Sequence, residues 1–397
     1  MASARLRTLL LTQNGTGAEV VWADTLLRGL LRLPAGTPCP RPLRRIAPVR
    51  VLFSLLKDHY RALSYTIDWR DALVASPRLA VEECNINDRI RYHRCMRRIR
   101  EYDLVIVAHS AAGDDMTLLN RAVEPLSRRS GPLAVFIGNE YDLLGEKIAF
   151  LRATAAQIVG SQLPLAAARY LYGDCGPTRV VSMPHALNPA LYSPGPDGGR
   201  DIDIGFIGDL YWPFIGDDLR TRMVRGFQAE GPAHGLVCDI RTERIDREQW
   251  AAFLRRCRAI IGAESGTYYL NDRGALLTKA RDYNLHENRD ATLQEVFDRF
   301  YRGVTPGVSG KAISSRHFEP IGTRTCQILM EGEYNGILRA DEHFIPVRLD
   351  MADMAEAIGK FRDETFRLGV VQRAYDHVMS AHTYAHRVQA LLQELGL

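Results

Sequence analysis

The sequence lacks the features of a membrane-spanning protein, a secreted protein and a zinc protein. It has no run of about 18 uninterrupted apolar residues, which argues against a membrane span. Its first apolar run is short and passes into Gln13 and Asn14 with no signal-peptide cleavage site. The seven cysteines form no C-x-x-C pair: Cys39, Cys84, Cys95, Cys175, Cys238, Cys257 and Cys326. We therefore expect reduced thiols in a cytoplasmic protein.

The sequence also has little excess of either charge. Lys and Arg number 51 and Asp and Glu number 47, so the net charge is +4, which argues against a dedicated nucleic-acid-binding protein. Arginine-rich runs at 41–50 and 89–100 can still form a local basic face. We favour a solvated face over one that binds lipid or a polyanion, and a peripheral membrane contact is left open.

Motifs for metals and dinucleotides are scarce. The only Asp-x-Asp is Asp201-Ile202-Asp203, at the start of a predicted strand, whereas a metal site in an open α/β sheet needs the outgoing end. We therefore expect no metal and no cofactor. No full G-x-G-x-x-G, internal repeat or low-complexity tract occurs.

What the sequence has is a strand–turn–helix rhythm that starts twice. Its 397 residues, 46% hydrophobic and 25% charged, are enough for two domains. Predicted strands lie at 7–12, 103–108, 133–138, 157–161, 179–183, 202–207, 236–240, 259–262, 336–338 and 344–347. Predicted helices lie at 163–172, 354–362 and 370–395, and 267–302 is either helical or a long excursion. The Gly- and Pro-rich segment 195–200 reads as a linker, which predicts an α/β protein of two domains.

Polar residues follow several strands of the first half. Asn14, Gly15 and Thr16 follow the first strand, and His109 and Glu140 follow two later ones. Open α/β sheets bind ligands at the carboxyl ends of their strands, so we expect these residues to lie near a bound ligand. His109 can act as a base or hydrogen-bond a sugar, or else it is a structural turn residue. Glu140 alternatively caps the following helix.

The stretch 305–347 carries the strongest functional signal. Glycines space the loop from Gly307 to Gly310, and Ser314 and Ser315 follow. Glu319 then opens a segment with a helical pattern at Ile321, Cys326, Ile328 and Leu329. A loop that leads into a helix N-terminus favours a diphosphate, and an acid in the first turn can accept hydrogen bonds from the vicinal hydroxyls of a ribose. The alternative is an ordinary loop–helix junction in which Glu319 complements the helix dipole.

The run S-S-R-H-F-E-P-I-G-T-R-T-C-Q-I-L, followed by H-F-I-P-V, resembles the donor-site stretch of group-1 glycosyltransferases, and within them the CgeB-like branch. The resemblance implies a GT-B fold, two Rossmann-like domains that face a central cleft, with a C-terminal helix that crosses back to the first domain. It implies domains at 1–194 (acceptor side) and 201–368 (donor side), and a returning segment 369–397. The strand-end residues of the first half then lie on the acceptor side: Asn14, Gly15, Thr16, His109 and Glu140.

The same resemblance implies residue roles. Glu319 matches the glutamate on the donor ribose, and the loop that faces the diphosphate and the sugar matches Ser314 to His317. The remaining donor-side residues are Gly208 in the first turn of the second half, Arg316, Gly322 and Thr323. Family members also carry basic residues soon after that first turn; the nearest candidates here are Arg220, Arg222 and Arg225, which come later than the usual spacing.

The sequence departs from the family at Lys311, where many retaining members have a glutamate that contacts the donor sugar. We name Lys311 and His109 as candidate catalytic residues. The function predicted is transfer of a hexose from a nucleotide-diphosphate sugar to an acceptor, with retention suspected, in polysaccharide biosynthesis. A GT-B sugar-nucleotide epimerase and a non-catalytic sugar-nucleotide-binding protein are the alternatives.

Overall fold

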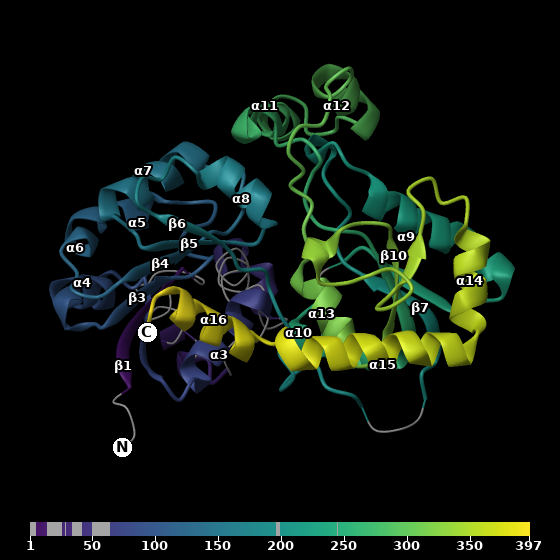
Figure 1. Cartoon of the computed structure of the whole chain (residues 1–397), viewed down its shortest axis with the longest axis horizontal. Helices are drawn as coiled ribbons and strands as arrows, with labels where there is room; N and C mark the ends of the chain where they lie inside the picture. Colours follow the sequence, from purple (N-terminus) through teal and green to yellow (C-terminus); the bar gives the residue numbers. More distant parts are fainter. Residues whose placement is uncertain are drawn as a thin grey trace. The chain divides into compact units, whose positions relative to one another are not determined.

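A computed structural model of the chain describes residues 5–13, 26–27, 29–33, 42–49, 64–195, 199–243 and 245–397 (Figure 1). The candidate acceptor-side residues Asn14, Gly15 and Thr16 lie outside the described residues. The chain divides into two compact units. One comprises Met1–Gly160, Asp174–Val180 and Leu395–Leu397, and the other comprises Ser161–Gly173 and Val181–Glu394. The predicted domain limits and the predicted return of the last helix to the first domain stay predictions.

The first half of the chain forms a six-stranded sheet. Its strands are β1 (Leu6–Thr12), β2 (Leu79–Asn85), β3 (Leu104–Val107), β4 (Leu133–Phe136), β5 (Ile158–Ser161) and β6 (Arg179–Ser182). Its helices are η1 (Leu43–Arg45), α3 (Ser64–Ala75), α4 (Arg89–Arg97), η2 (Ile99–Glu101), α5 (Thr117–Asn120), α6 (Val123–Ser127), α7 (Leu144–Thr154) and α8 (Leu165–Tyr172).

The order of the first sheet is β2-β1-β3-β4-β5-β6, so β1 pairs in parallel with β2 on one side and with β3 on the other. The chain therefore changes direction across the sheet between β1 and β3, and such a switch point is where open α/β sheets bind ligands. The central strands β3 and β4 are buried at every residue. This burial explains why they read as continuous apolar runs.

The second half forms a five-stranded sheet. Its strands are β7 (Ile202–Ile207), β8 (Cys238–Arg241), β9 (Cys257–Gly262), β10 (Cys326–Met330) and β11 (Ile345–Val347). Its helices are η3 (Pro213–Ile215), α9 (Leu219–Glu230), η4 (Pro232–His234), α10 (Arg247–Arg256), η5 (Asn271–Gly274), α11 (Ala275–Asp282), η6 (Tyr283–Glu287), α12 (Leu293–Phe300), α13 (Ser315–Gly322), η7 (Tyr334–Gly336), α14 (Met354–Arg362), α15 (Glu364–Ala381) and α16 (Tyr384–Glu394).

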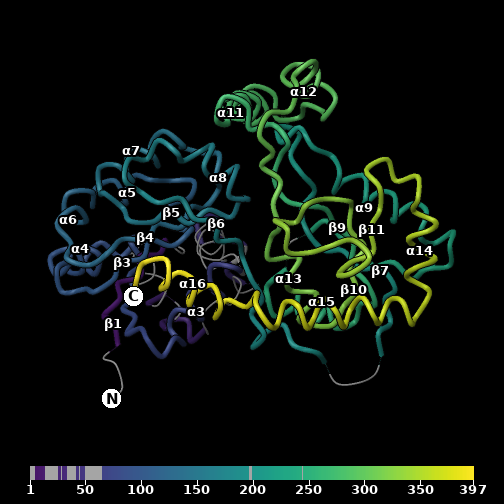
Figure 2. The backbone as a smooth tube through the Cα atoms, in the orientation of Figure 1, coloured from purple at the N-terminus to yellow at the C-terminus, as the bar shows by residue number. Residues whose placement is uncertain are grey.

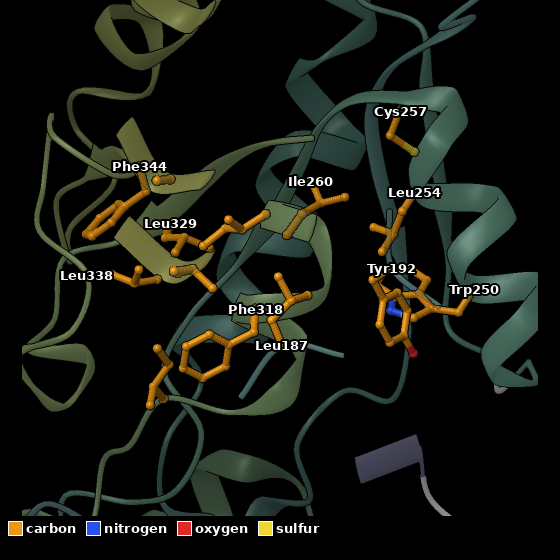
Figure 3. Close-up of a cluster of buried hydrophobic side chains, with 14 of the residues drawn as sticks. Leu187, Tyr192, Trp250, Leu254, Cys257, Ile260, Phe318, Leu329, Leu338 and Phe344 are labelled. Carbon is orange, nitrogen blue, oxygen red and sulfur yellow. The ribbon is translucent and has the colours of Figure 1, made fainter. Parts of the chain in front are cut away.

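The order of the second sheet is β11-β10-β9-β7-β8, with parallel pairing, so its switch point lies between β7 and β9. Helices cover both faces. One buried cluster joins β9 and β10 to α10, α13 and α15, and part of it is drawn in Figure 3. The other joins the opposite face to α9 and α14. Figure 2 shows α15 running beside α13 and β10 in this unit. The predicted α/β architecture with two parallel sheets is confirmed.

Between β9 and α13 the chain makes an excursion of helices. A short antiparallel neck, in which Ser265 pairs with Ala312, carries the chain out and back. Beyond it, η5, α11, η6 and α12 enclose a small aromatic core that includes Tyr301 and Phe297. Residues 267–302 are therefore mainly helical, and the same helices form the excursion.

The helical pattern predicted from Ile321 to Leu329 is wrong. Helix α13 ends at Gly322, after an internal Pro320, and Arg324 takes a φ of 56° that breaks the helix. Residues 326–330 form β10, which is buried at every position in the middle of the sheet. A fully buried strand is apolar on both faces, so its sequence cannot be told from a buried helix by periodicity.

The helix itself begins earlier than predicted. Ser314 is its N-cap and Ser315 its first residue, so Glu319 lies in the second turn and not in the first. Glu319 therefore does not stabilise α13 through the helix dipole, because the interaction of a charge with the dipole falls off within the first turn.

Two further predictions are corrected. The predicted strand at 336–338 is absent. Gly336 has a φ of 70° and ends the turn η7, and Ile337 follows in a helical conformation with its N–H bonded to the carbonyl of Tyr334. The single helix predicted at 370–395 is two helices, α15 and α16. They are separated at His382 and Thr383, where the backbone of Thr383 pairs with Leu187.

Candidate functional site

Several of the candidate donor-side residues lie at the switch point of the second sheet, beyond the carboxyl ends of β7 and β9. Gly208 directly follows β7, and a Cβ at this position would lie 3.3 Å from Nη2 of Arg316. Glycine therefore leaves room for the guanidinium of Arg316, which arrives from the first turn of α13 and donates a hydrogen bond to the carbonyl of Ile207. The structure thus brings together two predicted residues that lie more than a hundred positions apart.

Arg316 is held by Trp250 of α10 as well. Its guanidinium carbon lies 4.3 Å from the centre of the indole ring. Burial lowers the pKa of Arg316, and the neighbouring Glu319 carboxylate opposes this shift. A buried guanidinium stacked on an indole is preorganised, so a phosphate that meets it needs little further ordering of the side chain.

Glu319 is buried, with 2% of its surface exposed. Its carboxylate accepts a hydrogen bond from Trp250 Nε1 at 2.7 Å, and it also interacts with the hydroxyls of Ser315 and Tyr192. Burial raises its pKa, while Arg316 and these three hydrogen-bond donors act in the opposite direction. Tyr192 and Trp250 are labelled in Figure 3. A carboxylate has about four lone-pair sites, so Glu319 is a nearly saturated acceptor of hydroxyl and N–H groups.

Arg220, near the start of α9, supplies a second cation. It donates to Ser265 Oγ at 3.2 Å and lies over the ring of Tyr211 at 4.1 Å. Its charge contributes to the lowered pKa of both Arg316 and His317, so it lies close enough to both to repel a positive charge on them. No carboxylate forms a salt bridge with Arg220 in the described part of the chain. Two such guanidinium groups favour an anion between them.

His317 and Ser314 form the cap of α13. The backbone N–H of Ser314 donates to His317 Nδ1 at 3.0 Å, so Nδ1 is the acceptor and Nε2 carries the proton that faces the carbonyl of Ala263 at 3.2 Å. Burial lowers the pKa of His317 to about 3, with the charge of Arg220 adding to it. Both ring nitrogens are therefore engaged within the protein, and the ring is neutral.

The first-turn amides of α13 divide into two groups. Those of Ser314 and His317 make hydrogen bonds within the cap. Those of Ser315 and Arg316 have no acceptor inside the helix, because the first amides of any α-helix lack one. The backbone amides of Ser314 to His317 were predicted to hold the diphosphate. Of these four, the amides of Ser315 and Arg316 remain available to a ligand.

Gly322 and Thr323 lie at the other end of α13. A Cβ at Gly322 would lie 2.3 Å from the carbonyl oxygen of Tyr192, so glycine permits close packing there. Thr323 is buried, and its hydroxyl donates to the carbonyl of Pro320 at 3.0 Å. The structure does not bring these two candidates to Arg316 and Gly208; both take part in packing.

Lys311 lies in the neck of the excursion, beside this site. Its ammonium nitrogen is 3.0 Å from Asp217 Oδ2 and 3.2 Å from the carbonyl of Glu264, and both side chains of the ion pair are almost fully buried. The ring of Tyr268 lies 5.1 Å away. The cation of Lys311 is therefore matched by a carboxylate from another segment.

Glu264 is a further buried acid at the end of β9. It accepts the backbone N–H of Tyr334 at 2.7 Å, and burial raises its pKa. The sequence could have indicated Glu264 as a site residue, because it follows a predicted strand. No local pattern marks Trp250, Asp217 or Tyr192 as site residues.

In the first half, His109 follows β3 within an aromatic cluster. Its ring centre lies 5.2 Å from that of Phe136 and 5.8 Å from that of Trp69, and a small cavity beside it is also lined by Thr12 and Thr66. Burial lowers the pKa of His109 to about 3, which makes it a weak proton acceptor at neutral pH. Glu140 is buried in the turn after β4. Their acceptor-side roles stay predictions.

His109 predicts a pH dependence of stability. Its folded pKa of about 3 lies below the ordinary value of 6.5, so the unfolded chain binds the proton more readily and stability falls as the pH drops from about 6.5 toward 3. We expect His109→Phe to remove about 1.4 kcal/mol of this loss per pH unit. Urea unfolding at several pH values measures it. Parallel curves for the variant and the wild type would contradict the burial argument.

No helix long and apolar enough to cross a membrane occurs among the described residues. The same part of the chain contains no cluster of three or more His, Cys, Asp or Glu side chains suited to a metal ion. Its six cysteines are free: Cys84, Cys95, Cys175, Cys238, Cys257 and Cys326. Asp201 and Asp203 form salt bridges with Arg256 and Arg258 near the start of β7, as expected of strand-flanking charges.

This combination of two open parallel sheets, with site residues beyond the carboxyl ends at a switch point, is the GT-B fold. Residues 239–393, less than half of the chain, match the family model described as Glycosyl transferase-like. The chain is similar over 99% of its length, at 9% identity and a TM-score of 0.52, to the whole of a DNA-modifying beta-glucosyltransferase.

The chain is also similar over 99% of its length, at 9% identity and a TM-score of 0.51, to the whole of an alpha-glucosyltransferase solved with UDP and a 13-mer DNA. A comparison with curated proteins finds no match. At this identity the structures support the fold, and the predicted GT-B fold is confirmed. The assignment to the CgeB-like branch stays a prediction.

Proposed function

We propose that the protein is a glycosyltransferase that takes its sugar from a nucleotide-diphosphate sugar. The observation that carries this proposal is the position of Arg316 in the first turn of α13 next to Gly208, with a second cation, Arg220, close enough to lower the pKa of Arg316. Two guanidinium groups and two amides without helical acceptors suit a diphosphate. The match of residues 239–393 to a glycosyl transferase-like model supports the same reading.

The two guanidinium groups and the two amides would contribute to catalysis through electrostatic stabilisation. When the bond between the sugar and the diphosphate breaks, negative charge develops on the leaving diphosphate. Fixed cations and amides that face this charge stabilise the transition state more than the ground state. Arg316 is held by Trp250 and the carbonyl of Ile207, and Arg220 by Ser265 and Tyr211, so both are ordered before the substrate arrives.

Glu319 fits the ribose in this proposal. Its carboxylate already accepts hydrogen bonds from the hydroxyls of Ser315 and Tyr192. A ribose hydroxyl that replaces one of them keeps the buried carboxylate satisfied without adding a charge. The role of Lys311 changes accordingly, because its ammonium group is engaged with Asp217 and is better suited to hold the loop before α9 than to contact the sugar.

The finer points stay proposals: retention of configuration, independence of metal ions and cofactors, transfer to a glycan or another sugar-bearing acceptor, a part in polysaccharide biosynthesis and a cytoplasmic location. The sugar acceptor is assigned to the first half, near His109 and Glu140.

The test is calorimetric titration of a panel of nucleoside diphosphates. We expect the wild type to bind at least one, and Arg220→Met to weaken that binding by about one to two orders of magnitude, the loss of one charge-assisted hydrogen bond. Arg258→Met is the matched control, since Arg258 is paired with Asp203 at the opposite end of the sheet. Absence of binding across the panel would overturn the proposed function. Equal affinities of the wild type and Arg220→Met would show only that Arg220 does not contact the diphosphate.

A further inference from the structure

Helix α4 exposes a basic face. Its inner face buries Tyr92, Cys95 and Met96. The residues on the outside are Arg89, Ile90, Arg91, His93, Arg94 and Arg97, all exposed. Ile90, Arg94 and Arg97 are spaced i, i+4 and i+7, so they share one side of the helix. Ile90 is 75% exposed and lies at the N-terminal end of this side, between Arg89 and Arg91 in the sequence. Figures 1 and 2 show α4 at the periphery of the first unit.

These arginines have no local counter-charge. Residues 88–100 contain six arginines and one acid, Asp88. Asp88 uses its carboxylate to cap the helix, where it accepts the backbone N–H of Arg91. Acids of neighbouring elements have other partners: Glu82 and Glu101 face Arg98 at 3.7 and 3.1 Å, and Glu124 of α6 pairs with Arg128. Among the described residues, no salt bridge is formed by Arg89, Arg91, Arg94 or Arg97.

The chain as a whole carries a net charge of only +4, so this face is a local concentration of charge and not a share of a general excess. The phosphate groups of an anionic lipid surface complement such a face, and a basic amphipathic helix with an exposed apolar residue lies in the plane of a membrane interface. Single-stranded nucleic acid is the weaker fit, because stacking needs exposed aromatic rings and the one aromatic residue of α4, Tyr92, is buried.

We propose that α4 is a docking surface for anionic phospholipid membranes. The outward arginines contact lipid phosphates, and Ile90 enters the boundary between headgroups and acyl chains. The alternative that the sequence favoured, a merely solvated basic face, does not account for a largely exposed isoleucine next to the arginines. This inference stands independently of the proposed activity.

Sedimentation of the full-length protein with vesicles tests the proposal. We expect binding to phosphatidylcholine vesicles that contain phosphatidylglycerol, no binding to phosphatidylcholine alone, and loss at high salt. Arg94→Glu/Arg97→Glu should lower the partition coefficient roughly tenfold or more, since each basic residue near such a surface contributes about fivefold. Both side chains are exposed, so the fold is retained, and thermal unfolding checks this.

Arg169→Glu/Arg289→Glu, with the same change of net charge at two exposed sites elsewhere, should bind like the wild type. Ile90→Ser should weaken vesicle binding without changing the retention on heparin. Equal loss in the control pair would show a general charge effect and overturn the proposal. Binding of the wild type to duplex or single-stranded DNA that depends on Arg94 and Arg97, without vesicle binding, would overturn it in favour of nucleic acid.

Discussion

Replacement of Glu319 by alanine is expected to lower the free energy of unfolding by about 3–5 kcal/mol. The carboxylate is 2% exposed and interacts with Trp250, Ser315 and Tyr192. Its removal leaves three buried donors without an acceptor and removes the negative charge beside the buried guanidinium of Arg316. This loss is far larger than the 0.3–1 kcal/mol or so of a helix-dipole contribution.

Urea unfolding followed by tryptophan fluorescence measures the loss, with Trp250 as a local reporter. Glu319→Gln is the matched control, because its amide oxygen still accepts the indole N–H while the charge is gone. We expect it to lose about 1–2 kcal/mol. A loss below about 1 kcal/mol for Glu319→Ala would contradict the buried network. Affinity for a nucleoside diphosphate is then best compared in the glutamine variant, whose fold is less disturbed.

The second large effect is expected at Lys311. Lys311→Met should lower the free energy of unfolding by about 3–5 kcal/mol, because it leaves the carboxylate of Asp217 buried without its cation. The side chains of this pair are 3% and 1% exposed, so water cannot replace the lost partner. Chemical denaturation measures the change.

The double variant Lys311→Met/Asp217→Asn tests the reason for that effect. Removal of both charges should recover most of the loss, since a buried ion pair is worth little relative to neutral groups of the same size. Arg302→Met is the surface control: its pair with Asp298 is exposed, so we expect a change of at most about 1 kcal/mol. A double variant as unstable as Lys311→Met would show that the neck depends on more than charge balance.

Much of the fold could be predicted from the sequence, because buried parallel strands are continuous apolar runs between turn residues. The predicted segments at 7–12, 133–138 and 202–207 became β1, β4 and β7. The same property explains the main failure. Residues 326–330 are buried on both faces, so their apolar pattern carried no information about strand against helix.

The half-buried edge strand β2 was missed for the opposite reason. It has neither a continuous apolar run nor clean alternation, and it carries Glu82 and Glu83. Residues 336–338 were misread as a strand because Ile337 and Leu338 are apolar, whereas Gly336 ends the turn η7 with a positive φ and Ile337 follows in a helical conformation.

By itself the sequence determined the repeated α/β pattern, the glycine turn at Gly208, and a loop that runs into a helix carrying Arg316 and Glu319. These are local properties, set by the spacing of apolar residues and by turn and cap chemistry. Only the tertiary structure decided the partners of these residues: Arg220 and Trp250 beside Arg316, and Asp217 against Lys311. Such pairs join segments far apart in the chain, and packing of the whole sheet, not any neighbouring sequence, brings their atoms within reach.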